Sequence, residues 1–153
     1  MMKRAAIFNN SPGKCLEVYG SGRYEQLSQI CDLVPGVLTA DDVQQRLHEL
    51  GDIEAVFTTW GFPTLEAPIL DGLPQLKAVF YAAGSVKSFA PPLIERGIIV
   101  VSAWAANGVP VAEFTVAQVV LACKGYFHNT RDYVSAGVRA HLHRGAGVFG
   151  ETV

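Results

Sequence analysis

Short apolar segments rich in β-branched and aromatic residues alternate along this chain with segments of helical periodicity. The apolar segments predict strands, which comprise residues 4–8, 36–39, 55–59, 77–81 and 98–102. Strands that are almost entirely apolar and are separated by helices indicate a parallel sheet with both faces covered. The sequence therefore predicts a doubly wound α/β domain with a five-stranded parallel sheet.

The intervening segments carry apolar residues at helical spacing. They predict helices over residues 23–33, 41–50, 64–70, 90–96, 108–126 and 129–143. The long helix from Gly108 to about Tyr126 is preceded by Asn107, a favoured N-cap residue. That start places Pro110 in the first turn, where a missing N–H group costs little, and Glu113 near the positive end of the helix dipole.

Composition excludes several classes of protein. A chain of 153 residues with 50% hydrophobic residues suits one globular domain, and a net charge of −2 gives no basic patch for nucleic acid. The apolar run Val111–Cys123 contains Glu113 and is shorter than the roughly 18 residues of a membrane span. Three widely spaced cysteines without a CxxC motif predict neither a disulfide framework nor a zinc site. We therefore expect a soluble cytoplasmic protein with no membrane or nucleic-acid partner.

In doubly wound sheets, ligands bind beyond the carboxyl ends of the strands. This rule selects four loops: residues 9–10, 59–61, 82–85 and 103–107. The small residues Ala82-Ala83-Gly84-Ser85 form either an ordinary tight turn or a site whose backbone N–H groups hold a small anion such as a carboxylate. Trp60 either packs over a pocket or clamps a neighbouring helix.

Two other motifs do not indicate a binding site. Gly20-Ser21-Gly22 lacks the third glycine of a dinucleotide fingerprint and does not directly follow a strand. His141 and His143 lie two residues apart, so they would not face each other on a helix, and we expect no metal site there.

The segment from Leu73 to Lys124 resembles the D-isomer-specific 2-hydroxyacid dehydrogenases, a family that includes phosphoglycerate dehydrogenase-like enzymes. The family pattern has a Leu-Lys strand, a Gly-rich loop, a helix ending in Glu-Arg-Gly-Ile, and an Asn before Val-Ala-Glu at the head of a long helix. The matching residues here are Leu76-Lys77, Gly84, Glu95–Ile98, Asn107 and Val111–Glu113. The order and spacing together are specific, whereas each piece alone is weak.

The resemblance implies a flavodoxin-like substrate-binding domain, a nicotinamide cofactor (NAD or NADP) and a small 2-hydroxy or 2-oxo acid as substrate. It implies that Ala83, Gly84 and Ser85 offer N–H groups to the substrate carboxylate, with Ala83 beside the nicotinamide. Asn107 would approach the substrate, and the turn with Trp60 and Gly61 would line the same cleft. This sequence has Val86 where many relatives carry Asp.

The resemblance also implies a substrate-binding domain over residues 1–103, followed over 104–153 by connecting helices and the start of a nucleotide-binding domain. The family's GxGxxG follows a strand that would begin at about residues 151–153, and its catalytic Arg, Glu and His lie further on. We therefore expect an inactive fragment that lacks both. We further expect an apolar surface left bare by an absent covering helix, and a homodimer through helix 108–126. A stand-alone module that binds small carboxylates or mediates dimerisation, without catalysis, is the alternative.

Overall fold

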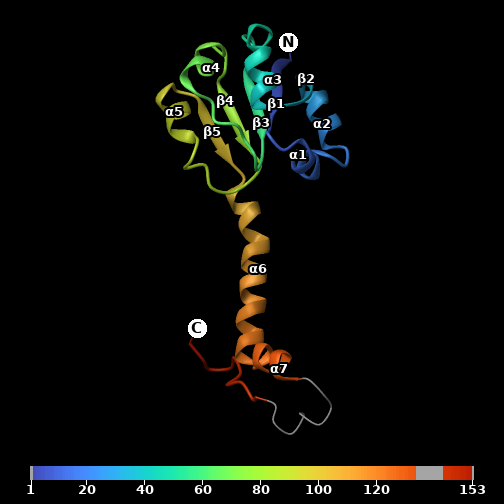
Figure 1. The fold of residues 1–153 in the computed structure, drawn as a ribbon, viewed down its shortest axis with the longest axis vertical. Helices are drawn as coiled ribbons and strands as arrows, with labels where there is room; N and C mark the ends of the chain where they lie inside the picture. Colours follow the sequence, from blue (N-terminus) through green and yellow to red (C-terminus); the bar gives the residue numbers. More distant parts are fainter. Residues whose placement is uncertain (1, 134–142, 153) are drawn as a thin grey trace. The chain divides into compact units, whose positions relative to one another are not determined.

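The computed structural model describes residues 2–133 and 143–152. The chain forms two compact units, a first unit, Met1–Asn107, and a second unit, Gly108–Val153. The first unit contains a parallel sheet in the order β2-β1-β3-β4-β5 (Figure 1). Its strands are β1 (Lys3–Phe8), β2 (Cys31–Leu38), β3 (Ala55–Thr58), β4 (Ala78–Tyr81) and β5 (Ile99–Ser102). The predicted five-stranded, flavodoxin-like α/β fold is confirmed.

Helices pack against both faces of this sheet, as the nearly all-apolar strands require. One face is covered by α3 (Ala40–Gln45), the 3₁₀ helix η1 (Leu47–Glu49), α4 (Ala67–Asp71) and α5 (Ala90–Glu95). Val56 and Val79 of the sheet are fully buried against this layer. On the other face, α1 (Pro12–Tyr19) and α2 (Arg23–Ile30) lie beside β1 and β2 and cover Ile7 (Figure 1).

Helix α3 begins at a capping box. The Thr39 hydroxyl accepts a hydrogen bond from the backbone N–H of Asp42, whose carboxylate accepts one from the Thr39 N–H at 2.9 Å. Together these bonds satisfy N–H groups that a helix start leaves without partners. The hydrogen bonds from Thr39 lower the pKa of the Asp42 carboxyl.

Two predicted boundaries near the amino terminus are wrong. The helix predicted over 23–33 ends at Ile30, and β2 starts at Cys31 rather than at Gly36. Helix α1 was not predicted, because Ser11-Pro12-Gly13 has the composition of a turn. Pro12 instead occupies the start of the helix, where its missing N–H group removes no helical bond.

The face of the sheet that carries α1 and α2 is only partly covered. Phe80 of β4 and Ile99 and Val101 of β5 point to this face and have side chains that are 38, 63 and 43% exposed. Alternate residues in a strand point to opposite faces, so the same strands bury Val79 on the covered side. An apolar strip along β3, β4 and β5 therefore remains open to solvent.

The long helix α6 (Trp104–Cys123) begins earlier than predicted. The Ala103 N–H still pairs with Tyr81 O in the sheet, and the Asn107 N–H already donates to Ala103 O at 2.9 Å. The chain thus turns from β5 into the helix at once, so Asn107 lies in the first turn and is not the N-cap. Pro110 consequently lies inside the helix.

Because α6 starts at Trp104, it is longer than the apolar run Val111–Cys123 that was compared with the length of a membrane span. Helix α6 contains 20 residues with a mean hydropathy of 1.3, so by length and composition it could cross a membrane, and none of it is buried. The prediction that the apolar run is too short was wrong, because it counted only Val111–Cys123. Helices of this kind also occur in soluble proteins. The length and composition of α6 therefore fit both a membrane span and a helix of a soluble protein.

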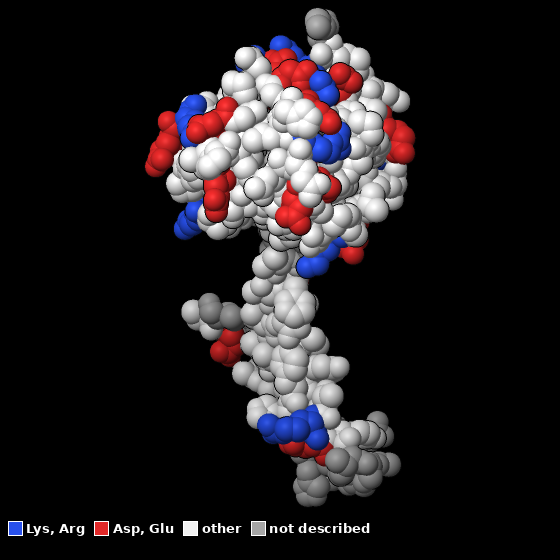
Figure 2. Space-filling view, turned by 45° about the horizontal axis from the view of Figure 1, so that its top comes forward, with Lys and Arg blue, Asp and Glu red and all other residues white. Residues whose placement is uncertain are grey.

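The second unit continues with α7 (Tyr126–Asp132), which follows Gly125 at a φ of 75°. Helix α7 begins earlier than the helix predicted over 129–143, and positions 134–142 of that prediction lie outside the described residues. In the face shown in Figure 2, acidic and basic side chains are interspersed over the first unit, and the surface of α6 is almost uncharged.

The thiol of Cys15 on α1 is fully buried, and this burial raises its pKa from 9.0 to about 11. The neutral thiol is the form that the fold favours. Its contribution to stability is therefore present below about pH 9 and lost as the pH rises through about 11.

We expect Cys15 to be alkylated by iodoacetamide at pH 8 at least about 100-fold more slowly than Cys123, because only the thiolate reacts. Cys123 is the matched control, since its side chain is partly exposed. Mass spectrometry of each peptide over time measures both rates. Equal rates for the two residues in the folded chain would contradict the prediction.

Candidate functional site at the carboxyl edge of the sheet

The strand order places a topological switch point between β1 and β3, where the chain reverses direction across the sheet. Asn9 follows β1 at this point and is fully buried. Its Nδ2 donates to Trp60 O at 2.9 Å, and its Oδ1 accepts from the Ser11 N–H at 2.7 Å. Asn9 therefore joins the loop after β1 to the loop after β3.

Two hydroxyl groups extend this network across the edge. The Thr59 hydroxyl donates to Ala82 O, linking the loop after β3 to the loop after β4. Ser102, at the end of β5, donates to Ala83 O at 3.0 Å and also to Gly84 O. The ends of four neighbouring strands are thus connected by side chains that are buried or partly buried.

The loop Ala83–Ser85 lies directly against Asn107. A Cβ atom on Gly84 would come within 2.9 Å of the Asn107 Nδ2, so only glycine fits without displacing that amide. Within the described residues, the backbone N–H groups of Ala83, Gly84 and Ser85 donate to no protein acceptor. Gly84 is partly exposed and Ser85 is exposed, so their N–H groups are open to water or to an anionic ligand.

Trp60 and Gly61 occupy the neighbouring loop after β3. Trp60 is 50% exposed, and the Gly61 carbonyl accepts a hydrogen bond from the Asn10 N–H at 2.8 Å. Gly61 adopts a φ of 99°, and a Cβ there would approach the Asn9 Oδ1 to 2.7 Å. The Trp60–Gly61 turn is therefore held by the tip of β1, and nothing in the described residues places it against the Gly84 loop.

Val86, at the position where many members of the family that the sequence resembles carry Asp, packs at the edge of the main core. Its carbonyl accepts hydrogen bonds from the N–H groups of Phe89 and Ala90 at the start of α5. The apolar side chain therefore serves packing at this position.

Sequence reasoning missed the roles of Asn9 and Ser102. In each case the sequence shows a polar residue at the end of an otherwise apolar strand. Such a residue lies at the edge of the sheet where the strand ends meet, and this position could have indicated its role. Side-chain hydrogen-bond partners depend on tertiary contacts, so only the structure identifies them.

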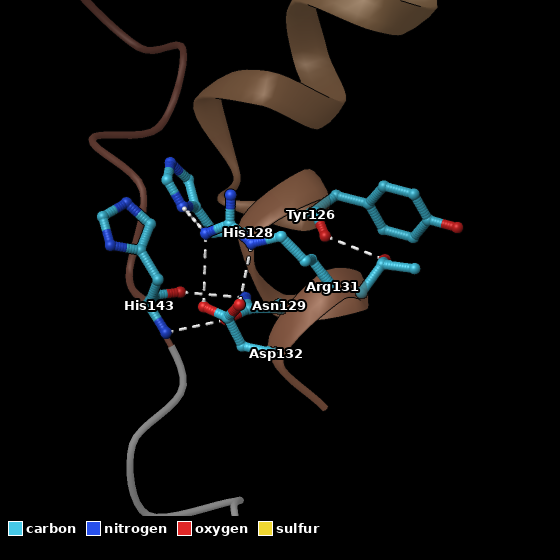
Figure 3. A network of polar contacts seen from close by, with 7 residues as sticks. Tyr126, His128, Asn129, Arg131, Asp132 and His143 are labelled. Carbon is cyan, nitrogen blue, oxygen red and sulfur yellow. Dashed lines mark hydrogen bonds and ion pairs between the residues drawn. The ribbon is translucent and has the colours of Figure 1, made fainter. Parts of the chain in front are cut away.

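A separate polar cluster lies in the second unit (Figure 3). The Asn129 side chain exchanges two hydrogen bonds with the backbone of His143, and the rings of His128 and His143 lie 4.8 Å apart. Arg131 pairs with Asp132, and this pairing lowers the pKa of the Asp132 carboxyl. Among residues 2–133 and 143–152 there is no group of three or more His, Cys, Asp or Glu side chains that could hold a metal, and His141 lies outside them.

One GxGxxG pattern does occur in the chain, at Gly145, Gly147 and Gly150, so the expectation that the chain lacks this pattern was wrong as a statement about sequence. In the structure, residues 143–152 form a loop without helix or strand. The Gly147 N–H donates to Cys123 O, at the end of α6. A dinucleotide fingerprint requires a strand before it and a helix after it, which the described residues here do not provide.

The fold and this edge define a doubly wound α/β domain with a candidate ligand site at its carboxyl ends. No protein-family model and no curated protein matches the chain. Among solved structures, it is similar to D-lactate dehydrogenase from Aquifex aeolicus, a complex with NAD and lactic acid, at 21% identity and a TM-score of 0.54. The match covers 84% of this chain and 36% of that one.

A second similar structure is phosphoglycerate oxidoreductase from Vibrio cholerae, at 23% identity and a TM-score of 0.49. The match covers 86% of this chain and 41% of that one, so the chain spans less than half the length of either structure. At the level of the fold, the similarity to the D-lactate dehydrogenase confirms the resemblance to D-2-hydroxyacid dehydrogenases.

Proposed function

We propose that this chain is the substrate-binding part of an NAD(P)-dependent D-2-hydroxyacid dehydrogenase. The whole enzyme would transfer a hydride between the nicotinamide and C2 of a small 2-hydroxy or 2-oxo acid. One observation carries the proposal: the Ala83–Ser85 loop, with its unpaired N–H groups, lies against the Asn107 amide. The family resemblance assigns both of these parts of the sequence to the substrate, together with the turn at Trp60 and Gly61.

The chain's own residues would bind and orient the acid. The N–H groups of Gly84 and Ser85 would hold its carboxylate, and the Asn107 amide would hydrogen-bond an adjacent oxygen. Ser102, which donates to the Gly84 carbonyl, would keep the loop in position. Orientation of this kind fixes the reacting carbon relative to a cofactor.

The described residues do not form a site for that cofactor. Ala83 is fully buried, backbone included, and the GxGxxG at 145–150 lacks the flanking strand and helix. We therefore propose that the 153-residue chain alone is catalytically inactive.

Two further features belong to the proposal. The apolar side chains of α6 are exposed, which favours a homodimer through the 108–126 region. The enzyme would act in the cytoplasm, with neither membrane nor nucleic acid as a partner.

The proposal predicts that the isolated chain does not oxidise NADH above background with glyoxylate or hydroxypyruvate. It also predicts that the DNA downstream of codon 153 encodes a strand followed by GxGxxG, in frame or after one frameshift. An NADH absorbance assay at 340 nm and sequencing of that DNA are the measurements. Substantial turnover by the isolated chain would contradict the inactive state, and a downstream region without the fingerprint would contradict the parentage.

The unpaired N–H groups also favour a second function, a stand-alone module that binds small carboxylates. Calorimetric titration with glyoxylate, without cofactor, tests this module, and the downstream DNA separates it from the substrate-binding part of a dehydrogenase. Measurable affinity that is lost in Gly84→Ala supports the module, because the new Cβ would displace Asn107. Gly13→Ala is the matched control, since a Cβ there meets nothing within 4 Å.

A further inference from the structure

Residues 143–147 lie against the corner between α6 and α7, and we call them the docked segment. The Asn129 side chain donates a hydrogen bond to His143 O at 2.9 Å and accepts one from the His143 N–H at 2.7 Å. At the other end of the segment, the Gly147 N–H donates to Cys123 O at 2.9 Å. Hydrogen bonds therefore hold both ends of the docked segment to the corner.

Two glycines allow the docked segment to approach the corner closely. A Cβ atom on Gly145 would overlap Cys123 O and come within 2.6 Å of the Gly125 N. A Cβ atom on Gly125 would come within 2.8 Å of the His143 Cδ2, and Gly125 has a φ of 75°, which glycine adopts without strain. The docked arrangement therefore depends on glycine at both positions.

The imidazole of His128 is neutral in this arrangement. The Arg131 Nη2 lies 3.2 Å from the His128 Nδ1 (Figure 3). A guanidinium group only donates hydrogen bonds, so Nδ1 is the acceptor and the ring carries its proton on Nε2. The ring of His143 lies 4.8 Å from that of His128. A proton on His128 would replace the hydrogen bond with repulsion from Arg131, and a proton on His143 would add a second cation beside it.

The charged groups around the two rings are mostly basic. Positions 124–133 and 143–147 contain one acidic residue, Asp132, and three basic residues, Lys124, Arg131 and Arg144. The Asp132 carboxylate pairs with Arg131 at 2.8 Å, and the hydrogen bond from Arg131 lowers the pKa of the Asp132 carboxyl. The carboxylate therefore stays ionised near neutral pH and is already engaged. Protonated rings would be surrounded by more positive than negative charge.

We propose that His128 and His143 form a pH-sensitive latch, in which the neutral rings keep the docked segment on the corner and protonation releases it. The docked state opposes proton uptake, so docking is favoured at high pH. It is lost as the pH falls through the range in which histidine takes up a proton, about pH 8 to 5. The inference goes beyond the proposed function, because it concerns the second unit alone and needs neither substrate nor cofactor.

NMR spectroscopy of the isotope-labelled 153-residue chain tests the latch through the backbone amides of Gly145 and Gly147. At high pH both amides are expected to be ordered, with the Gly147 N–H hydrogen-bonded. Between about pH 8 and about pH 5.5 the ratio of docked to released segment should fall by at least about 10-fold, because two protonations oppose docking. The amides of Val56 and Val79 in the core of the first unit should keep their chemical shifts, because the release is local.

Variants without titratable rings separate the latch from other effects of acid. His128→Gln keeps an acceptor for Arg131, and His143→Phe keeps an aromatic ring in the docked segment. The double variant is expected to remain docked at both pH values. His48→Gln is the matched control, because His48 is exposed on η1 in the first unit, and this variant should keep the full response.

Several results would overturn the latch. They are a wild-type segment that is already released at high pH or remains docked at low pH, and a double variant that is released at high pH or still responds to pH. A response that disappears in His48→Gln would also overturn it. None of these outcomes bears on the downstream sequence that tests the proposed function.

Discussion

Replacing Asn9 by alanine is expected to lower the free energy of unfolding of the first unit by about 2–4 kcal/mol. The side chain is fully buried and satisfies the Trp60 carbonyl and the Ser11 N–H, both at the switch point of the sheet. Alanine removes both hydrogen bonds from groups that are partly buried and leaves a void at a fully buried position. Urea denaturation of the two proteins measures the difference.

Asn10→Ala is the matched control for this prediction. Asn10 is exposed, and its side chain accepts one hydrogen bond, from the Ala40 N–H at 2.8 Å. Water can replace that bond, so we expect a loss of about 1 kcal/mol or less. Similar losses at positions 9 and 10 would show that the buried network at Asn9 contributes little.

Replacing Phe8 by alanine is expected to destabilise the first unit by about 3–5 kcal/mol. Phe8 is fully buried in the main core, between the sheet and the layer of α3, α4 and α5. Its removal loses the transfer free energy of the ring and leaves a cavity that the close-packed surroundings fill only in part.

Ile94→Ala on α5 is the control for the core prediction, because Ile94 is 60% exposed. Exposed substitutions usually change stability by less than about 0.5 kcal/mol. Thermal or urea unfolding followed by circular dichroism measures both variants. A loss at Phe8 no larger than at Ile94 would show that the ring does not pack as the structure describes.

Only part of the candidate site could be predicted from the sequence. Gly84 and Asn107 are 23 positions apart, and the family resemblance was the reason to expect them together. The expected N-cap role of Asn107 was wrong, because Ala103 still pairs with the sheet and the helix starts immediately afterwards. Local propensity could not reveal this, since the helix start is set by where the last sheet bond lies.

By itself, the sequence determined the class of fold and the approximate positions of β1, β3, β4 and β5, because apolar runs of strand length need cover on both faces. It also determined which loops follow the strands. Only the tertiary structure decided that Asn9, Thr59 and Ser102 connect those loops, and that the bare apolar surface lies along one side of β3, β4 and β5. Periodicity reports which residues prefer burial, whereas the partner of a buried polar group and the extent of cover depend on contacts between distant segments.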